Sequence, residues 1–240
     1  MYEPRFYRDQ SKTRLTKFLV CYKETDLLIF APIKLPDLCF STVRNLRMKL
    51  DFFIDENPDF LTSLLPLQVP EEAAKEIREM TQASTIVGVG PMAAVAGVFA
   101  EKVGLAVLEN TDEVIVENGG DLFVKLSEDC KVGVFAGKNS PFKDRLAIKL
   151  KSESMPLGVC TSSGMMGPSL SKGKADVVTI MSKSTALADA AATAVANRIK
   201  TKSDVGSVLN WIKGIEGIKG VLIIKDDKIG VWGEFELIRR

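Results

Sequence analysis

The sequence predicts one α+β domain in which a mainly antiparallel sheet packs against helices. Short runs of apolar and β-branched residues, which are typical of strands, outnumber the stretches with helical periodicity. Most segments between those runs are too short to hold the helical crossover that joins parallel strands. A chain of 240 residues can bury a sizeable core, and neither a linker nor a repeat divides it. We therefore expect residues 1–240 to form a single domain.

The first part of the chain is predicted to form a hairpin and then helices. Apolar runs over 16–22 and 26–32 flank a short polar turn, as in two paired strands. Apolar residues then recur at helical spacing from Asp37, a candidate N-cap, toward Asp55. Prolines interrupt this pattern, and a polar helix over 71–82 is expected to follow.

The rest of the chain combines short strands with helices rich in small residues. A short apolar run over 85–89 is predicted as a strand that leads into such a helix. Further strands are expected at 114–117, 122–126, 131–135, 146–149, 157–161 and 177–181. Two helices are predicted over 185–200 and 203–212, and a hairpin pairs 220–224 with 228–232.

Charge and hydropathy exclude two classes of partner. Lys and Arg number 32 against 31 Asp and Glu, so the net charge is +1 and no basic footprint for nucleic acid exists. No uninterrupted apolar run approaches the roughly 20 residues that span a bilayer. Residues 1–14 are charged and aromatic, unlike a signal peptide. The sequence therefore predicts a cytoplasmic protein without a membrane partner.

The chain contains no histidine, and this restricts its chemistry. Ser-His-Asp and Cys-His nucleophile pairs are excluded, and zinc, copper and iron sites lose their commonest ligand. The four cysteines are scattered without CxxC spacing, so neither a zinc site nor a redox dithiol is indicated. What remains is a site of carboxylate, hydroxyl and carbonyl oxygens, which suits Mg²⁺ or Ca²⁺.

The segment 88–93, Gly-Val-Gly-Pro-Met-Ala, has the spacing of a dinucleotide-binding fingerprint. Gly88 and Gly90 follow the expected strand. Glu109 lies about 20 residues further on, where dinucleotide-binding folds have an acidic residue that binds the ribose. This pattern would indicate an NAD-dependent oxidoreductase. Because the surrounding strands look antiparallel, we favour a tight turn before a closely packed helix. A phosphate near that helix N-terminus remains physically reasonable.

Two polar segments end strands and could admit a ligand. Asn118, Gly119, Gly120 and Asp121 lie between two strand-like runs, and an Asn-Gly pair there predicts a hairpin turn with positive φ. The glycines would also let a ligand approach the backbone beside Asp121. The second segment, 160–164, contains a cysteine, three hydroxyl residues and a glycine. It is either a set of donors for a phosphate or flavin, or a polar loop.

A carboxylate and a hydroxyl lie on one face of the alanine-rich helix. Asp189 and Thr193 are four residues apart, so both project from the same side. Together they would form half of a site for a hard cation. The alternative is that alanine is the best helix former and that Asp189 is favoured near the helix N-terminus.

Taken in order, these segments resemble the ApbE family, whose better-known members are FAD:protein FMN transferases. Residues 119–121 resemble its Gly-Gly-Asp turn, and residues 161–164 its Thr-Ser-Gly segment. Residues 177–180 resemble its Val-Thr-Val strand, and residues 188–193 its Ala-Asp-Ala-x-x-Thr helix start. The resemblance runs over about 86–196. The N-terminal part looks closer to a short branch of the family found in archaea and anaerobic bacteria.

The resemblance implies an ApbE-like, T-fold-like architecture with FAD or FMN as its ligand. In the transferases, the counterparts of Asp189 and Thr193 bind the Mg²⁺ that bridges the FAD pyrophosphate. A protein acceptor is the second partner that the family implies. By the same resemblance, the nucleotide would contact glycines and hydroxyl residues of the motifs, namely Gly88, Gly90, Gly119, Gly120, Asp121, Thr161, Ser162, Ser163 and Gly164.

The chain departs from the transferases at two places. Met92 stands near the position of a family lysine, and residues 165–174 lack the histidine proposed to assist catalysis. These departures favour binding of a flavin or another nucleoside diphosphate over Mg²⁺-dependent FMN transfer or FAD pyrophosphatase activity. Asp121 and Cys160 remain the candidates for a catalytic group.

Two other functions stay open on the sequence. Cys160 sits beside a hydroxyl-rich strand end, where it could act as a thiol or persulfide carrier, provided that its pKa is lowered. The resemblance to family members of anaerobes implies sulfur assimilation as the setting for such a carrier. Alternatively, the chain is a non-catalytic partner that kept the fold and lost the activity. The sequence does not decide whether it forms an oligomer.

Overall fold

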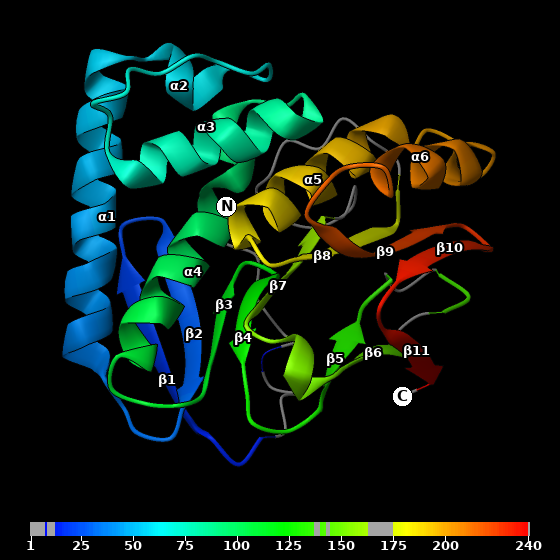
Figure 1. The fold of residues 1–240 in the computed structure, drawn as a ribbon, viewed down its shortest axis with the longest axis horizontal. Coiled ribbons are helices and arrows are strands. Elements are labelled where there is room, and N and C mark those ends of the chain that lie inside the picture. The colour runs from blue at the N-terminus through cyan, green and yellow to red at the C-terminus, as the bar shows by residue number, and fades with distance from the viewer. Residues whose placement is uncertain (1–7, 9–12, 137–139, 143–144, 163–174, 240) are drawn as a thin grey trace.

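Two antiparallel sheets and a set of helices make up the computed structural model, which describes residues 8, 13–136, 140–142, 145–162 and 175–239 (Figure 1). The larger sheet contains, in spatial order, β1 (Thr16–Tyr22), β2 (Thr25–Ala31), β3 (Val114–Asn118), β4 (Asp121–Lys125), β7 (Leu157–Ser162), β8 (Val177–Ser182), β9 (Ile218–Lys225) and β10 (Lys228–Gly233). The smaller sheet contains β11 (Glu236–Arg239), β6 (Leu146–Leu150) and β5 (Cys130–Val134). The paired strands of the described residues all run antiparallel, which confirms the α+β prediction.

The helices cover one face of the larger sheet (Figure 1). They are α1 (Pro36–Glu56), α2 (Asp59–Thr62), α3 (Lys75–Val87), α4 (Val95–Leu108), α5 (Thr185–Arg198) and α6 (Asp204–Ile212). The smaller sheet packs on the opposite face, against β4, β7, β8 and β9. Because β8 is covered from both sides, all six of its residues are buried.

Helix α5 lies at the centre of the helical layer. It contacts α3 and α4 on one side and β7 and β8 on the other, and 11 of its 14 residues are buried. Its alanines allow this central position, since small side chains let neighbouring backbones approach closely. Alanine is also the strongest helix former, so the same residues serve local structure and packing. In α1, by contrast, only the stripe Cys39, Val43, Leu46 and Leu50 is buried.

Except for 85–89, the predicted strands are confirmed to within one or two residues. The expectations for 85–89, for the N-cap of the first helix and for the start of the polar helix are corrected. Residues 85–87 form the last turn of α3 rather than a strand. The prediction was wrong because so short an apolar run does not distinguish the two-residue period of a strand from the 3.6-residue period of a helix. Asp37 lies in the first turn of α1, whose N-cap is Leu35. The polar helix begins at Lys75, later than expected. The short strand β11 was missed because it lacks a clear alternation.

Residues 91–108, a 3₁₀ turn (Pro91–Ala94) followed by α4, are long and apolar enough to span a membrane by length and composition alone. Half of this stretch is buried inside the fold, where α4 packs against β3, β4 and α5. Glu101 and Lys102 interrupt the run, so its sequence did not suggest a span. The single-domain organisation and the cytoplasmic location stay predictions.

Gly97 permits the close contact between α4 and α5. A Cβ atom at this position would lie 2.4 Å from the carbonyl oxygen of Thr185 and 2.8 Å from the Cβ of Asp189. The nearest of these is a backbone atom, so it cannot move aside without displacing α5. Gly206 in α6 offers a contrast, because a Cβ there would meet nothing within 4 Å.

We expect Gly97→Ala to lower the free energy of unfolding by about 1–3 kcal/mol, the usual cost of overpacking. Gly206→Ala should raise it by about 0.5–1 kcal/mol, because alanine is the better helix residue and meets no obstacle there. Urea denaturation of both variants measures the difference. A stabilising Gly97→Ala would show that the two helices are not in close contact.

Candidate functional site

Three of the predicted motifs converge where β4 and β7 meet the start of α4. Asp121 is the first residue of β4, and its Oδ1 accepts a hydrogen bond of 3.1 Å from the backbone N–H of Thr161 in β7. Asp189, from α5, lies close enough to Asp121 for their charges to interact. We call Asp121 and Asp189 the carboxylate pair. Its members are 7% and 8% exposed and come from motifs that are far apart in the sequence.

Asp189 caps the N-terminus of the neighbouring helix. Its Oδ2 accepts a hydrogen bond of 2.8 Å from the N–H of Gly97, and the Ala96 N–H also contacts the carboxylate. N–H groups in the first turn of a helix lack partners within that helix, so a carboxylate from outside can satisfy them.

Helix α4 in turn caps the N-terminus of α5 with one of its own acids. Oε2 of Glu101 accepts a hydrogen bond of 2.7 Å from the N–H of Thr185, the first residue of α5. In each helix the acid lies four residues after the N–H that the partner helix satisfies, as Gly97 precedes Glu101 and Thr185 precedes Asp189. We call this arrangement the reciprocal cap. It fixes where the Asp189 carboxylate lies.

Burial raises the pKa of both acids in the carboxylate pair. For Asp189 it raises the pKa to about 7, although the Gly97 and Ala96 N–H groups oppose the shift. For Asp121 burial raises the pKa well above its usual value, and the charge of Asp189 raises it further. The site thus holds two acids that repel one another when ionised, which is an arrangement that favours a proton or a cation between them.

The turn between β3 and β4 has the conformation that its glycines predict. Gly119 has a φ of +67° and Gly120 a φ of +103°, and the register pairs Asn118 with Asp121 across the turn. Asn118 Nδ2 donates a hydrogen bond of 3.1 Å to the Ala96 carbonyl in α4. The turn is therefore attached to the helix start that Asp189 caps.

The hydroxyl segment is only partly described. The Oγ1 atoms of Thr161 and Thr179 lie 3.0 Å apart on neighbouring strands, and Ser162 is buried at the end of β7. Ser163 and Gly164 lie outside the described residues, as does the segment 165–174. Thr161 is half-buried beside Asp121, which places one predicted cofactor ligand at the carboxylate pair.

Cys160 is completely buried between these strands and α5. Its Sγ donates to the carbonyl of Thr185 at 3.6 Å and also contacts Asp121. Burial raises the pKa of the thiol well above its usual value, and the charges of Asp121 and Asp189 raise it further. A reactive thiolate needs a lowered pKa and access, so this environment does not favour a thiol or persulfide carrier.

The oxygen ligands in reach of a cation are few. Thr193 is half-buried one turn after Asp189 on α5, as predicted from their spacing. Among the described residues, no group of three or more Cys, Asp or Glu side chains could hold a metal ion. A cation here would need further oxygens from a bound ligand or water, which is the usual manner of Mg²⁺.

Gly88 and Gly90 occupy positions where packing explains them. Gly88 ends α3 with a φ of +76°, and its N–H donates to the Ser84 carbonyl. A Cβ at Gly90 would lie 1.8 Å from the carbonyl oxygen of Ser63. Residues 75–87, which precede these glycines, form α3 instead of the expected strand, and Glu109 is the C-cap of α4. The strand-to-helix setting that a dinucleotide fingerprint requires is therefore contradicted.

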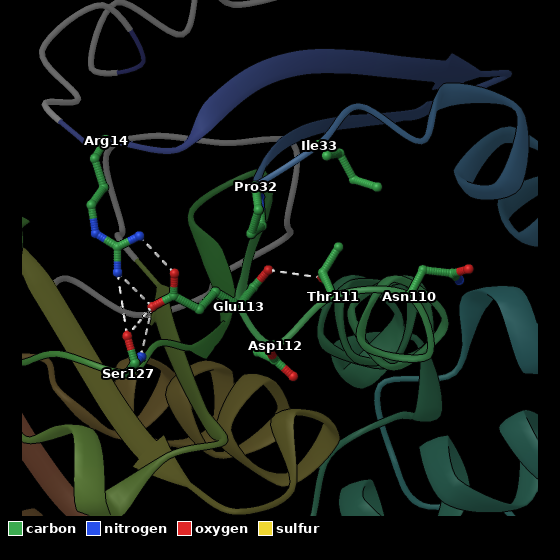
Figure 2. A pocket seen from close by; sticks show the side chains of 8 residues that line it. All are labelled: Arg14, Pro32, Ile33, Asn110, Thr111, Asp112, Glu113 and Ser127. Atoms are coloured by element: carbon green, nitrogen blue, oxygen red, sulfur yellow. Dashed lines mark hydrogen bonds and ion pairs between the residues drawn. The ribbon is translucent and has the colours of Figure 1, made fainter.

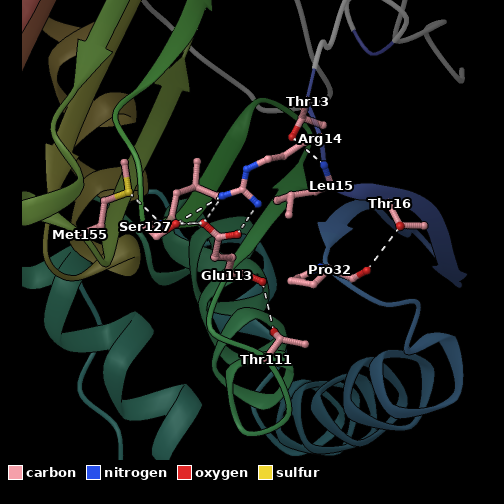
Figure 3. Close-up of polar contacts among 10 residues, drawn as sticks. Thr13, Arg14, Leu15, Thr16, Pro32, Thr111, Glu113, Ser127 and Met155 are labelled. Carbon is pink, nitrogen blue, oxygen red and sulfur yellow. Dashed lines mark hydrogen bonds and ion pairs between the residues drawn. The ribbon is translucent and has the colours of Figure 1, made fainter.

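A hollow among the described residues lies at the other end of α4. It measures about 520 Å³ and opens beside Arg14, Asn110 and Glu113 (Figure 2). Glu113 is fully occupied there, since Arg14 donates two bonds of 2.7 and 2.8 Å and the Ser127 N–H a third of 2.8 Å (Figure 3). These hydrogen bonds lower the pKa of Glu113 to about 2, and those from Arg14 contribute most. This hollow shares no residue with the predicted motifs.

Sequence reasoning found the acids of the site but missed what holds them. The contacts of Asp189 with α4, and of Asn118 with Ala96, join residues 92 and 22 positions apart. Gly97 was the available signal, because a glycine inside an apolar helix often marks a close approach of two backbones.

Known proteins resemble this chain in sequence and in fold. A family model described as "AbpE bacteria" matches residues 7–210. A UPF0280 protein of Methanocaldococcus jannaschii is 39% identical over 199 residues, which cover 80% of each chain. The flavinyl transferase ApbE of Pseudomonas stutzeri has a similar structure, with a TM-score of 0.59, 10% identity and coverage of 91% and 94%. The flavin transferase ApbE of Vibrio cholerae gives a TM-score of 0.56, 11% identity and coverage of 91% and 96%.

The four thiols are expected to differ in reactivity. Cys21 is exposed, whereas Cys160 is completely buried and its thiol pKa is raised. Because alkylation requires access and a thiolate, iodoacetamide should modify Cys21 at least about tenfold faster than Cys160 in the folded protein. Peptide mass spectrometry over a time course measures both rates. If Cys160 reacts first, the thiol-carrier function regains support.

The carboxylate pair predicts how stability depends on pH. Folding raises the pKa of Asp189 to about 7, so its stabilising contribution is present when protonated and is lost as the pH rises through that value. In EDTA, we expect the free energy of unfolding to fall by on the order of 2 kcal/mol between about pH 5 and pH 8.

Asp189→Asn should flatten this pH dependence, while the exposed Asp112→Asn should leave it unchanged. Urea denaturation at several pH values gives the slope for each protein. An equal slope in wild type and Asp189→Asn would mean that the Asp189 pKa is not raised.

Proposed function

This chain belongs to the AbpE bacterial family, and from that premise we propose that it binds a flavin nucleotide where β4, β7, α4 and α5 meet. The family and the shared fold support a flavin-related function, since the matching structures are ApbE flavin transferases. The observation that carries the proposal is the carboxylate pair, which stands beside a glycine turn and the start of a helix.

The glycine turn supplies the surface for the nucleotide. Gly119 is exposed and Gly120 half-buried, and neither carries a side chain that would keep a ligand from the backbone. Thr161 and Ser162 add hydroxyl groups at the adjacent strand end, and Ser163 and Gly164 would extend this set. Phosphate oxygens and the polar edge of a flavin both accept hydrogen bonds from such groups.

The donors around Asp189 fit Mg²⁺. They are hard oxygens, and two buried acids that repel one another gain from a cation that neutralises them. Asp189 can cap α4 and still bind an ion, because a carboxylate has about four lone-pair directions and the N–H groups of Gly97 and Ala96 use only some of them. Asp189 and Thr193 would hold the ion, which would neutralise charge on the pyrophosphate of FAD.

The chain's own groups favour binding over turnover. No histidine exists to move a proton, so that role would fall to Asp121. Its raised pKa lets the carboxyl hold a proton at a higher pH than an exposed aspartate would. FMN transfer to a protein acceptor and hydrolysis of FAD to FMN and AMP are the two activities to assay.

We expect FAD to bind, with an affinity that rises when Mg²⁺ is added. Asp189→Ala should remove the effect of Mg²⁺ and weaken binding at least about tenfold, because the ion loses its carboxylate. Asp112→Ala is the matched control, as an exposed aspartate beyond the opposite end of α4. Titration of flavin fluorescence with and without Mg²⁺ measures these affinities.

Two outcomes would contradict the proposal: no detectable binding at millimolar FAD, or equal affinities for wild type and Asp189→Ala. Chromatography of the same samples for FMN and AMP separates an enzyme from a binding protein. Equal rates of FAD cleavage in wild type and Asp189→Ala would favour the non-catalytic function.

A further inference from the structure

A buried arginine from the N-terminal segment contacts two strands near the glycine turn. Arg8 is 8% exposed, and its Nη1 donates to Oδ1 of Asp26 in β2 at 2.8 Å. Its Nη2 reaches the Asp26 carbonyl at 3.0 Å, and its Nε donates to Oε2 of Glu117 in β3 at 2.6 Å. A buried charge is costly unless it is paired, so these contacts fix the guanidinium in one place.

Glu117 connects this arginine to the turn. Its Oε2 accepts from Arg8, and its Oε1 accepts a hydrogen bond of 2.9 Å from the N–H of Gly120. Because Glu117 is only 4% exposed, its carboxylate cannot rely on bulk water to hold its orientation. Arg8 is therefore one of the contacts that orient Glu117, and Glu117 in turn holds the Gly120 amide.

The turn needs such external contacts. Two successive glycines restrict the backbone less than any other pair of residues, so their positive φ angles are not set by local sterics. The Gly120 N–H to Glu117 is one restraint, and the Asn118 bond to Ala96 is another. Asp121 follows immediately, so a shift of the turn moves the carboxylate pair.

We infer that Arg8 is a positioning residue for the flavin site, acting through Glu117 on the Gly119–Gly120 turn. This inference rests on the proposed function for what the turn binds. The relay itself, from Arg8 to Glu117 to Gly120, rests on geometry alone.

Arg14 provides a matched control in the same N-terminal segment. It also makes an ion pair with a buried glutamate, Glu113, which lies just before the start of β3. Glu113 bonds to Ser127 and has no described contact with the glycine turn. Arg14→Ala should therefore remove the ion pair with Glu113 without affecting Gly120.

The test compares Arg8→Ala with Arg14→Ala in the full chain. Amide resonances in ¹H–¹⁵N spectra report the Gly120 N–H, and flavin fluorescence gives the Kd for FMN. We expect Arg8→Ala to move the Gly120 resonance and to weaken FMN binding at least about tenfold, as for a lost positioning contact. Arg14→Ala should leave the Gly120 resonance unchanged within error and the Kd for FMN within about twofold of the wild-type value.

Glu117→Gln provides an independent route should Arg8→Ala fail to fold. It keeps the shape of the side chain but replaces the oxygen that faces Arg8 or Gly120 with an amide, so it should shift the same resonance. Both substitutions break the same relay. The Kd of the double variant for FMN should therefore be no higher than that of whichever single variant has the higher Kd.

The inference is overturned if Arg8→Ala leaves the Gly120 resonance in place, if it moves the resonance but not the Kd, or if Arg14→Ala has the same effects. Additive losses in the double variant would also contradict the relay. If the wild type binds FAD but not FMN, the same comparison is made with the Kd for FAD. If it binds neither flavin, the proposed function fails, and the Gly120 resonance alone decides whether Arg8 positions the turn.

Discussion

The reciprocal cap between α4 and α5 is the interaction on which the rest of the structure depends. Asp189 satisfies the first turn of α4, and Glu101 satisfies the first residue of α5. This exchange requires the two backbones to lie close together, which explains Gly97 and the alanines of α5. It also keeps a carboxylate buried beside Asp121, where burial and repulsion raise the pKa of both acids. The same contact thus serves stability and creates the candidate site.

The sequence predicted those features that depend on residues close together in the chain, and it missed contacts between residues far apart in the chain. Strands and the Asn118–Asp121 turn follow from alternation and glycine chemistry within a few residues, and both are confirmed. The spacing of Asp189 and Thr193 likewise placed them on one helix face. The strand predicted at 85–89 was wrong at 85–87, since so short an apolar run fits a helix end as well as a strand. The bonds from Asp189 to Gly97 and from Arg8 to Glu117 span 92 and 109 positions and leave no local pattern.

The fold is shared with ApbE flavin transferases, while the chemistry of this chain has its own restrictions. At 10–11% sequence identity, the likeness to those structures establishes the fold alone. The activity has to be inferred from the residues of the site. A chain without histidine has carboxyl, amine, phenol and thiol groups for proton transfer, and the described residues place two carboxyl groups together. Cys160 lies against this pair, but its burial and raised pKa make it part of the packing.

The claim that a cation and a flavin nucleotide meet at Asp189 is tested most directly by crystallography. Crystals soaked with FAD and Mn²⁺, which replaces Mg²⁺ and scatters anomalously, would locate both. We expect an anomalous peak in contact with the Asp189 carboxylate and a pyrophosphate beside the Gly119–Gly120 turn. FAD bound in the hollow near Arg14, or an ordered FAD with no metal peak at Asp189, would contradict it.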